Sequence, residues 1–163
     1  MNEQIFREYD VRGVVDRDLT DEVVYDLARA IGTFYRDNGV TSASLGRDAR
    51  ESSPRFSELM IRGLTETGID VIDVGMVPTP VLYYTLFTLN VGAGVMITGS
   101  HNPADNNGFK ICIGKSTIFG DQISAIKRIA LSRRNGFVYS VCGCHSHGAG
   151  RGHIASGGPL GGE

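Results

Sequence analysis

Apolar positions along the chain follow two alternating spacings, which predict a succession of helices and strands. Three segments carry apolar residues every three or four positions, as one buried helix face requires: residues 20–38, 53–67 and 121–133. Thr20 can cap the first helix, and Ser53 can cap the second, with Pro54 in its first turn. We therefore expect three amphipathic helices, the first two ending at glycines.

Thr79 followed by Pro80 repeats the signal of a cap and a first-turn proline, so we expect a fourth helix that is capped by Thr79. We expect one face of this helix to consist of Val81, Tyr84, Thr85 and Leu89.

Short apolar segments between these helices are typical of buried strands: 43–46, 70–74, 92–97 and 109–113. Strands that alternate with helices predict an α/β fold with three layers, α/β/α, in which helices cover both faces of the sheet. Ligands of such a fold gather at the loops beyond the strand ends. This interpretation places one domain in residues 1–134.

Composition fits a globular protein, with 163 residues, 41% hydrophobic content and a mean hydropathy of −0.07. A net charge of −2 disfavours nucleic acid as a partner. The apolar runs are too short for a membrane span, and the first residues lack the features of a signal peptide. We therefore expect a cytoplasmic protein with no nucleic-acid or membrane partner, whose three cysteines stay reduced.

Residues 135–163 differ from the rest of the chain, because glycine is frequent there and the regular apolar spacing is lost. We expect this tail to lack regular structure or to be foreign to the domain, with a truncation and an altered reading frame both open as explanations. The run from Cys142 to His147 contains cysteines and histidines, but not in the usual spacing of zinc ligands, so we interpret it as chance.

The most informative segment is the run from Thr98 to Pro103, which places Ser100 on a tight loop directly after an apolar strand. We expect Gly99 to provide backbone dihedrals that a side chain would forbid, and Pro103 to make the loop rigid. An ordinary connecting turn is the alternative. A serine-hydrolase elbow is disfavoured, because the second glycine of its motif is absent and proline follows.

Polar groups near Ser100 favour a phosphate as its ligand or modification. Lys110 provides a point positive charge, and His101 and Asn102 add hydrogen-bond donors. Phosphoryl transfer depends on such groups, because they neutralise the oxygens of the transferring phosphate.

Three segments in order resemble one family, the α-D-phosphohexomutases, in the variant typical of bacterial phosphomannomutase/phosphoglucomutase. Residues 98–103 together with 107–110 resemble its active-site phosphoserine loop. Residues 6–13 resemble its N-terminal F-R-x-Y-D-I-R-G signature, and residues 45–50 its G-R-D-x-R loop. The resemblance implies the family's first domain, with a mixed, mostly parallel sheet that carries one antiparallel strand.

The implied activity is an intramolecular phosphotransfer, an isomerisation of hexose 1-phosphate and hexose 6-phosphate. It would proceed through phospho-Ser100 and a bisphosphorylated sugar, with a phosphorylated hexose as substrate and hexose 1,6-bisphosphate as activator. The resemblance also implies Mg²⁺, bound in part by a phosphate oxygen on Ser100.

The resemblance assigns roles to seven residues of this chain. The catalytic residues would be Ser100, Lys110, His101 and Arg12, and the residues that bind substrate or phosphate would be Tyr9, Asn102 and Arg47.

Structural alternatives stay open for several of these residues. Lys110 could be a solvated strand-end lysine, His101 could cap the loop, and Arg12 could belong to a surface loop held by an ion pair. Arg47 and Asp48 could form a structural pair rather than contact substrate.

The resemblance covers residues 5–133, one domain of the family's four. The family's D-G-D-G-D loop for magnesium and its G-E-x-S-G-H loop for the sugar are absent from this sequence. We therefore expect a truncated chain that lacks domains II to IV and is inactive alone. The alternative is a non-catalytic module for phosphosugar binding or domain interaction.

Overall fold

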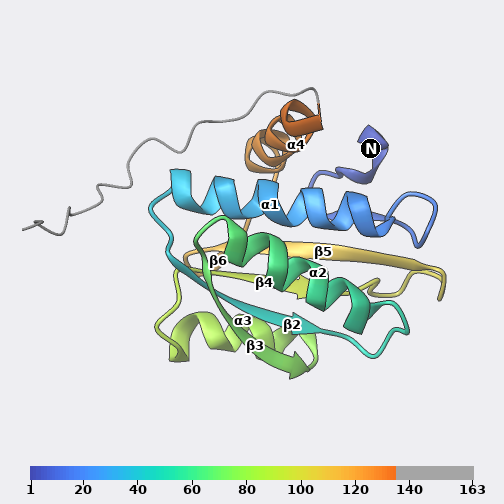
Figure 1. The fold of residues 1–163 in the computed structure, drawn as a ribbon. Helices are drawn as coiled ribbons and strands as arrows, with labels where there is room; N and C mark the ends of the chain where they lie inside the picture. The colour runs from blue at the N-terminus through green and yellow to red at the C-terminus, as the bar shows by residue number, and fades with distance from the viewer. Residues whose placement is uncertain (135–163) are drawn as a thin grey trace, which may run out of the picture.

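A mixed β-sheet of six strands lies at the centre of the computed structural model, which describes residues 1–134 (Figure 1). The strands are β1 (Val11–Val14), β2 (Ser42–Arg47), β3 (Asp70–Met76), β4 (Ala93–Ile97), β5 (Asn106–Ile113) and β6 (Ser116–Thr117). Their order across the sheet is β1-β5-β4-β2-β3, and β6 pairs with β5. The predicted glycine-rich tail and the run from Cys142 to His147 lie outside the described residues.

The direction of β5 distinguishes it from the other strands. β2 pairs in parallel with both β3 and β4, whereas β5 pairs antiparallel with β4, β1 and β6. All described strands except β5 therefore point the same way. This arrangement confirms the predicted α/β fold, with a mostly parallel sheet and one antiparallel strand.

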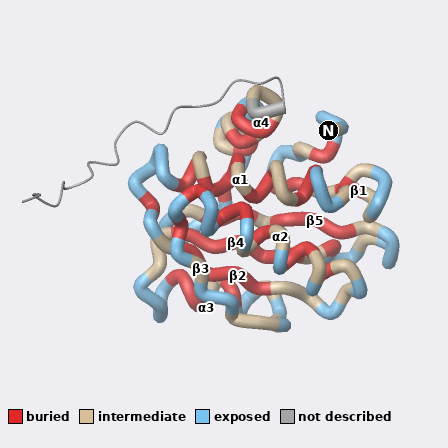
Figure 2. The backbone as a smooth tube through the Cα atoms, in the orientation of Figure 1, coloured by how far each residue is buried: buried red, intermediate tan, exposed pale blue. Residues whose placement is uncertain are grey.

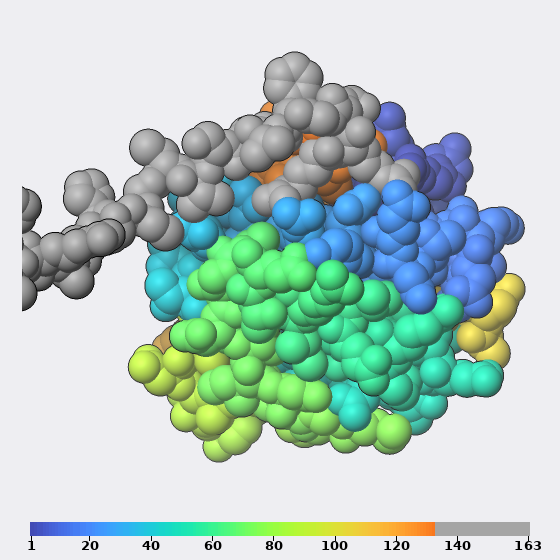
Figure 3. All heavy atoms as spheres, viewed as in Figure 1, coloured from blue at the N-terminus to red at the C-terminus, as the bar shows by residue number. Residues whose placement is uncertain are grey.

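Helices cover both faces of the sheet. On one face lie α1 (Asp21–Asp37) and α2 (Ser53–Glu66), with α4 (Asp121–Arg134) packed against α1, and on the other lies α3 (Thr79–Thr88) (Figure 1). A single 3-10 turn, η1 (Glu3–Ile5), precedes β1. Figure 3 shows α1 and α2 side by side on the surface.

The main core fills the space between the sheet and the layer of α1 and α2, where buried positions follow the central strands in Figure 2. Its largest fully buried side chains include Tyr35, Phe56 and Phe109. The rings of Phe56 and Phe109 lie 5.9 Å apart and join α2 to β5. Burying each such side chain contributes about 1.5–3 kcal/mol to folding.

Helix α1 agrees with its sequence signals. The Thr20 hydroxyl accepts a hydrogen bond from the Val23 N–H at 3.3 Å, which satisfies one free donor of the first turn. The helix ends at Asp37, and Gly39 follows with a φ of +75°, a conformation in which glycine is favoured. The predicted cap and the predicted end are both confirmed.

Helices α2 and α3 begin one residue earlier than predicted. Ser53 and Thr79 are the first helical residues, so the prediction that they are caps is wrong; the caps are Ser52 and Pro78, and neither makes a side-chain cap bond. The Ser53 hydroxyl instead contacts the Asp48 carboxylate at 2.6 Å. A partner outside the helix, in the loop after β2, therefore takes the hydroxyl that the local pattern had assigned to the helix end.

The face predicted for α3 is also wrong in large part. Of its four residues only Thr85 is buried, whereas Val81, Tyr84 and Leu89 are exposed, and Leu89 lies just beyond the helix end. The other buried residues of α3 are Leu82 and Leu86. Apolar residues lie on nearly all sides of this helix, so their spacing cannot identify the side that faces the sheet.

Two strands were not predicted from the sequence. β1 lies within the segment interpreted as a loop, and its four residues are too few to show a clear alternation. β6 has two residues and is identified only by its pairing with β5.

Cys112 is a free cysteine in the core, and burial raises its pKa to about 12. Its thiol is therefore protonated at neutral pH. Within residues 1–134 the structure has no helix with the length and apolar character that membrane crossing needs.

Replacing Phe56 by alanine is expected to lower the free energy of unfolding by about 3–5 kcal/mol, because a fully buried ring is lost and a cavity remains. Urea denaturation followed by circular dichroism measures the change. Phe87→Ala is the control, because this ring is 60% exposed and its loss should change stability by less than about 1 kcal/mol. Equal losses in the two variants would contradict this account of the core.

Candidate active site

The serine loop, residues 98–105, joins β4 to β5 and carries Ser100 in an unusual conformation. Ser100 has a φ of +53°, in the left-handed region that residues with a side chain rarely adopt. Gly99 is not among the described glycines with a positive φ, so the reason predicted for that glycine is wrong. The left-handed residue of the loop is the serine itself, at a cost of about 1–3 kcal/mol.

Local hydrogen bonds support this turn. The Ser100 N–H donates to the Thr98 hydroxyl at 2.9 Å. The Asn102 side chain and backbone N–H both donate to the Gly99 carbonyl, at 2.8 and 3.0 Å. The predicted donor Asn102 therefore holds the loop closed in this structure.

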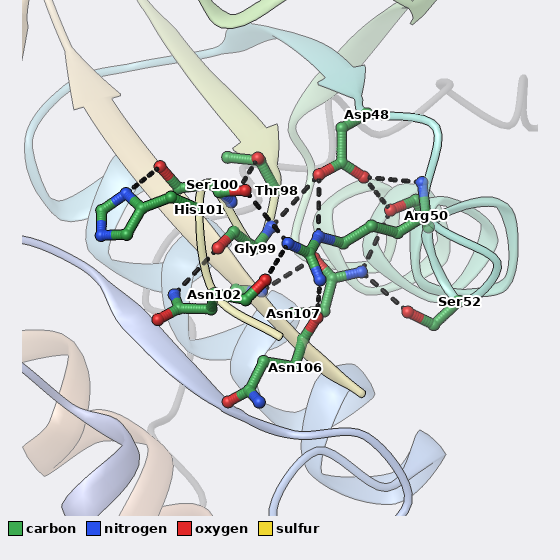
Figure 4. A network of polar contacts seen from close by, with 12 residues as sticks. Asp48, Arg50, Ser52, Thr98, Gly99, Ser100, His101, Asn102, Asn106 and Asn107 are labelled. Atoms are coloured by element: carbon green, nitrogen blue, oxygen red, sulfur yellow. Dashed lines mark hydrogen bonds and ion pairs between the residues drawn. The ribbon is translucent and has the colours of Figure 1, made fainter. Parts of the chain in front are cut away.

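His101, a predicted site residue, contacts the Ser100 hydroxyl directly. Its Nδ1 is 3.2 Å from the Ser100 Oγ, and both residues are exposed (Figure 4). The ring can accept the serine proton or donate to the oxygen, depending on its tautomer.

Asp48 follows directly after β2 and connects three segments. Its backbone N–H donates to the Ile97 carbonyl at 2.9 Å, which places it beside the serine loop. Its carboxylate accepts hydrogen bonds from the Ser53 hydroxyl at 2.6 Å, the Arg50 N–H at 3.1 Å and the Gly99 N–H at 3.2 Å. The start of α2 and the serine loop thus share one carboxylate.

The pKa of Asp48 is lowered from its ordinary value. Partial burial acts to raise this pKa, but hydrogen bonds from the Ser53 hydroxyl, the Arg50 N–H, Thr98 and the Gly99 N–H together outweigh burial. The ionised form is therefore the form that the surrounding donors stabilise.

Arg50 binds the serine loop through its guanidinium group (Figure 4). The carbonyl acceptors and their distances are Pro103 at 2.6 Å, Asn106 at 2.8 Å, Asn102 at 2.8 Å and Ser100 at 3.0 Å. Its Nε lies 3.3 Å from the Asp48 carboxylate. Arg50 is the last residue of the segment that resembles the G-R-D-x-R loop, and the resemblance assigned it no role.

Asn107, the second residue of β5, is fully buried and connects that strand to α2. Its side-chain amide donates to the hydroxyls of Ser52 at 2.8 Å and Ser53 at 3.0 Å, and its carbonyl accepts from the Gly108 N–H at 2.8 Å. These contacts hold the end of the serine loop against the start of α2.

A second group of charges lies where β1 pairs with β5. The buried Asp10 carboxylate forms an ion pair with Arg12, whose Nε is 3.2 Å away, and lies 3.9 Å from the Lys110 Nζ. Arg12 is opposite Gly108 in the strand pairing, where an added Cβ would lie 2.9 Å from that of Arg12. The structure therefore brings two predicted catalytic cations to one carboxylate.

Tyr9 and Asn102 lie with Arg12 on the wall of one cavity of about 530 Å³, next to the N-terminal segment. Tyr9 is 68% exposed, and its ring centroid is 6.5 Å from that of Phe119. Arg7 and Arg17 line the same cavity. Two residues predicted to bind substrate thus share a cavity with a predicted catalytic arginine.

Arg47 is placed differently from the other predicted site residues. It is the last residue of β2, and its guanidinium lies 3.3 Å from the Asp73 carboxylate on β3. Among residues 1–134, the hydrogen bonds from its side chain go to Asp73 and not to the serine loop.

Ligands for a metal ion are few in this part of the chain. Residues 1–134 contain no group of three or more histidine, cysteine or acidic side chains placed to hold a metal ion. A phosphate on the exposed Ser100 would supply one oxygen ligand for Mg²⁺, so the described residues fit a shared metal site and not a complete one.

Comparison with known proteins identifies relatives of this domain. A family model described as phosphoglucomutase/phosphomannomutase, alpha/beta/alpha domain I, matches residues 3–136. A phosphoglucomutase of Neisseria gonorrhoeae is 46% identical over 134 residues, which cover 82% of this chain and 29% of that protein. A phosphomannomutase/phosphoglucomutase of Pseudomonas aeruginosa is 50% identical over 123 residues, which cover 76% of this chain and 27% of that protein.

Solved structures agree with the sequence comparison. A phosphoglucomutase/phosphomannomutase family protein of Burkholderia thailandensis matches with a TM-score of 0.78 and 37% identity, over 82% of this chain and 31% of that chain. A protein of Thermus thermophilus, described as a phosphomannomutase, matches with a TM-score of 0.73 and 29% identity, over 77% of this chain and 29% of that chain. The chain thus spans less than a third of the length of these relatives.

Replacing Asp48 by asparagine is expected to lower the free energy of unfolding at pH 7 by about 1–3 kcal/mol, because donors that face the carboxylate lose their charged acceptor. The lowered pKa fixes the sign of the pH dependence. The stabilisation by Asp48 is complete above the usual range of an aspartate pKa, and it is lost as the pH falls through the lowered pKa of the folded state.

Urea denaturation of the wild type and of Asp48→Asn between pH 7 and pH 2.5 measures this difference. Asp37→Asn is the control, since Asp37 is an exposed carboxylate at the end of α1. If the difference in free energy of unfolding between the wild type and Asp48→Asn grows as the pH falls, the assignment of the ionised form to Asp48 in the folded state is wrong.

Proposed function

The chain belongs to the phosphoglucomutase/phosphomannomutase family, and from this membership we propose that it takes part in converting hexose 1-phosphate and hexose 6-phosphate into one another, with Ser100 as the phosphate carrier. The observation that carries the proposal is the presentation of Ser100. A left-handed serine with an exposed side chain stands on a loop held by Asp48, Arg50 and Asn102.

The proposed reaction is two phosphoryl transfers. Phospho-Ser100 gives its phosphoryl group to the free hydroxyl of a hexose monophosphate: the bond from phosphorus to the serine Oγ breaks as a bond to the sugar oxygen forms. The sugar hydroxyl loses its proton in this step, and the released serine Oγ gains one. The hexose 1,6-bisphosphate turns, and its other phosphoryl group returns to the Ser100 Oγ. The enzyme is restored, and the net result is an isomerisation.

The cations at β1 and β5 suit this transfer. Lys110 and Arg12 share Asp10, which restrains both side chains beside the sheet end that carries the serine loop. We assign to them the stabilisation of negative charge on the transferring phosphoryl group. His101, at 3.2 Å from the Ser100 Oγ, is positioned to exchange a proton with it when the serine is free.

Substrate binding is assigned to Tyr9 and Asn102, because both line the cavity that Arg12 lines. For Arg47 we propose the structural role that the sequence left open, since its guanidinium lies against Asp73. A direct contact with substrate would require Arg47 to leave this carboxylate.

We propose a domain at residues 1–134 that works together with further sequence. Mg²⁺ would bind a phosphate oxygen on Ser100 and take its other ligands from outside the described residues. When bound, the ion neutralises negative charge on the phosphoryl group. Because the chain spans 27% to 29% of its relatives, we propose that sustained turnover requires protein segments that this sequence does not contain.

Incubating the chain with hexose 1,6-bisphosphate and Mg²⁺ is expected to add one phosphate-sized mass increment to the protein, measured by intact-mass spectrometry. Ser100→Ala should abolish the increment, because the acceptor oxygen is lost. Ser116→Ala is the control, since this serine is exposed on β6 and outside the site. An increment that persists in Ser100→Ala would refute the assignment, and a folded wild type that never gains it would favour a module that only binds phosphosugars.

Replacing Lys110 by glutamine is expected to slow the phosphorylation of Ser100 by on the order of 100-fold, because a cation that stabilises the transferring phosphoryl group is removed. The same mass measurement, taken as a time course, gives the rate. Lys115→Gln is the control, because the Lys115 Nζ lies 5.1 Å from the Phe87 ring centroid, far from the serine loop in the strand pairing. Equal rates in Lys110→Gln and the wild type would exclude Lys110 from the transfer.

A further inference from the structure

The N–H groups of the Arg50 guanidinium all point to the serine loop or to the residues next to it. An arginine side chain has five N–H bonds in one plane. Four of them meet the carbonyl oxygens of Ser100, Asn102, Pro103 and Asn106, and the fifth, on Nε, points to Asp48 at 3.3 Å. The side chain is only 15% exposed.

We propose that Arg50 is the positioning residue of the serine loop, and that its guanidinium keeps Ser100 in the left-handed conformation that presents the hydroxyl to substrate. The inference rests on the proposed role of Ser100 as phosphate carrier. Arg50 bonds to the carbonyl of Ser100 itself and to three carbonyls that follow it, so the path of the chain after Ser100 is set by one rigid group.

The direction of the carbonyl groups gives this contact a second effect. Arg50 lies on one side of the loop, and the side chains of Ser100 and His101 extend on the other (Figure 4). Four carbonyl oxygens that accept bonds from Arg50 have their negative ends turned toward its positive charge. A phosphate on Ser100 would therefore meet less repulsion from the backbone of its own loop.

Gly99 supplies independent evidence for a close fit. A Cβ at this residue would lie 2.3 Å from both the Cζ and the Nε of Arg50, closer than real Cβ contacts. Since the φ of Gly99 is not in the left-handed region, its backbone conformation does not demand glycine. Glycine is required here by the Arg50 guanidinium, because that group packs directly on the backbone of the loop.

Lysine cannot replace this contact. Its ammonium group has three donors around one nitrogen, whereas the carbonyls and the carboxylate that surround Arg50 need five donors in a plane. The requirement is therefore for the shape of the guanidinium as well as for its charge.

Amide hydrogen exchange measured by NMR on the whole 163-residue chain tests the proposal. In Arg50→Ala and Arg50→Lys, the Gly99 and Asn102 amides are expected to exchange about 10-fold faster or more than in the wild type, while the amides of α1 and β4 keep their protection. Arg62→Ala is the control, because Arg62 is 66% exposed and pairs with Glu66. It should leave the loop amides unchanged.

A double-mutant cycle distinguishes a direct contact from a general loss of stability. Gly99→Ala should speed exchange as Arg50→Ala does, because the added methyl displaces the guanidinium. The double variant should match either single variant, since the contact can be lost only once. Additive effects, unchanged loop amides in Arg50→Ala, or faster exchange throughout the domain in both Arg50 variants would each overturn the proposal.

A rescue experiment links the contact to Ser100. Phosphorylation of Ser100 by hexose 1,6-bisphosphate should be slower in Arg50→Ala by on the order of 10-fold to 100-fold. Millimolar guanidinium chloride should restore part of the rate, and ammonium chloride at equal ionic strength should not. If the two salts act alike, the positioning role is wrong. If the wild type is not phosphorylated, the proposed function fails, and the exchange data still decide the role of Arg50.

Discussion

The Arg50 guanidinium determines the geometry of the candidate active site. The serine loop and the adjoining Asn106 turn four backbone carbonyls to one side, and Arg50 donates to all four. Arg50 is largely shielded from solvent, with 15% of its side chain exposed, and such a cation needs a counter-charge and hydrogen-bond acceptors; Asp48 provides the counter-charge at 3.3 Å. Asp48 in turn binds the Gly99 N–H, so the same ion pair holds the loop from two sides.

The antiparallel strand β5 explains why distant segments meet at this loop. Because β4 and β5 form a hairpin, the serine loop lies at the end of the sheet where β2 also ends and Asp48 begins its loop. On its other edge β5 pairs with β1, which brings Arg12 to Gly108 and places Asp10 within reach of Lys110. The proposed carrier and the proposed cations are thus arranged by one strand.

Local sequence signals predicted a helix correctly where it has one apolar face and where no contact from outside the helix competes for its end residues. Helix α1 has a threonine cap, a continuous buried face and a glycine after its end, and all three agree with the structure. These signals failed where a contact outside the helix competed with them. Ser53 gives its hydroxyl to Asp48 rather than to the end of α2, and the apolar surface of α3 gave no preference for one side.

The amino-acid sequence by itself determined the order of the four helices and of the strands β2 to β5, the α/β class and the place of Ser100 after a buried strand, because these depend on residue spacing along the chain. Only the tertiary structure decided which arginine of residues 45–50 reaches the serine loop. Arg47 is still part of β2, and its side chain lies against Asp73 of the neighbouring strand. Arg50 lies beyond the strand, where the Asp48 bond to Ile97 and the carbonyls of a loop about fifty residues away set its direction, and no local pattern encodes partners that distant.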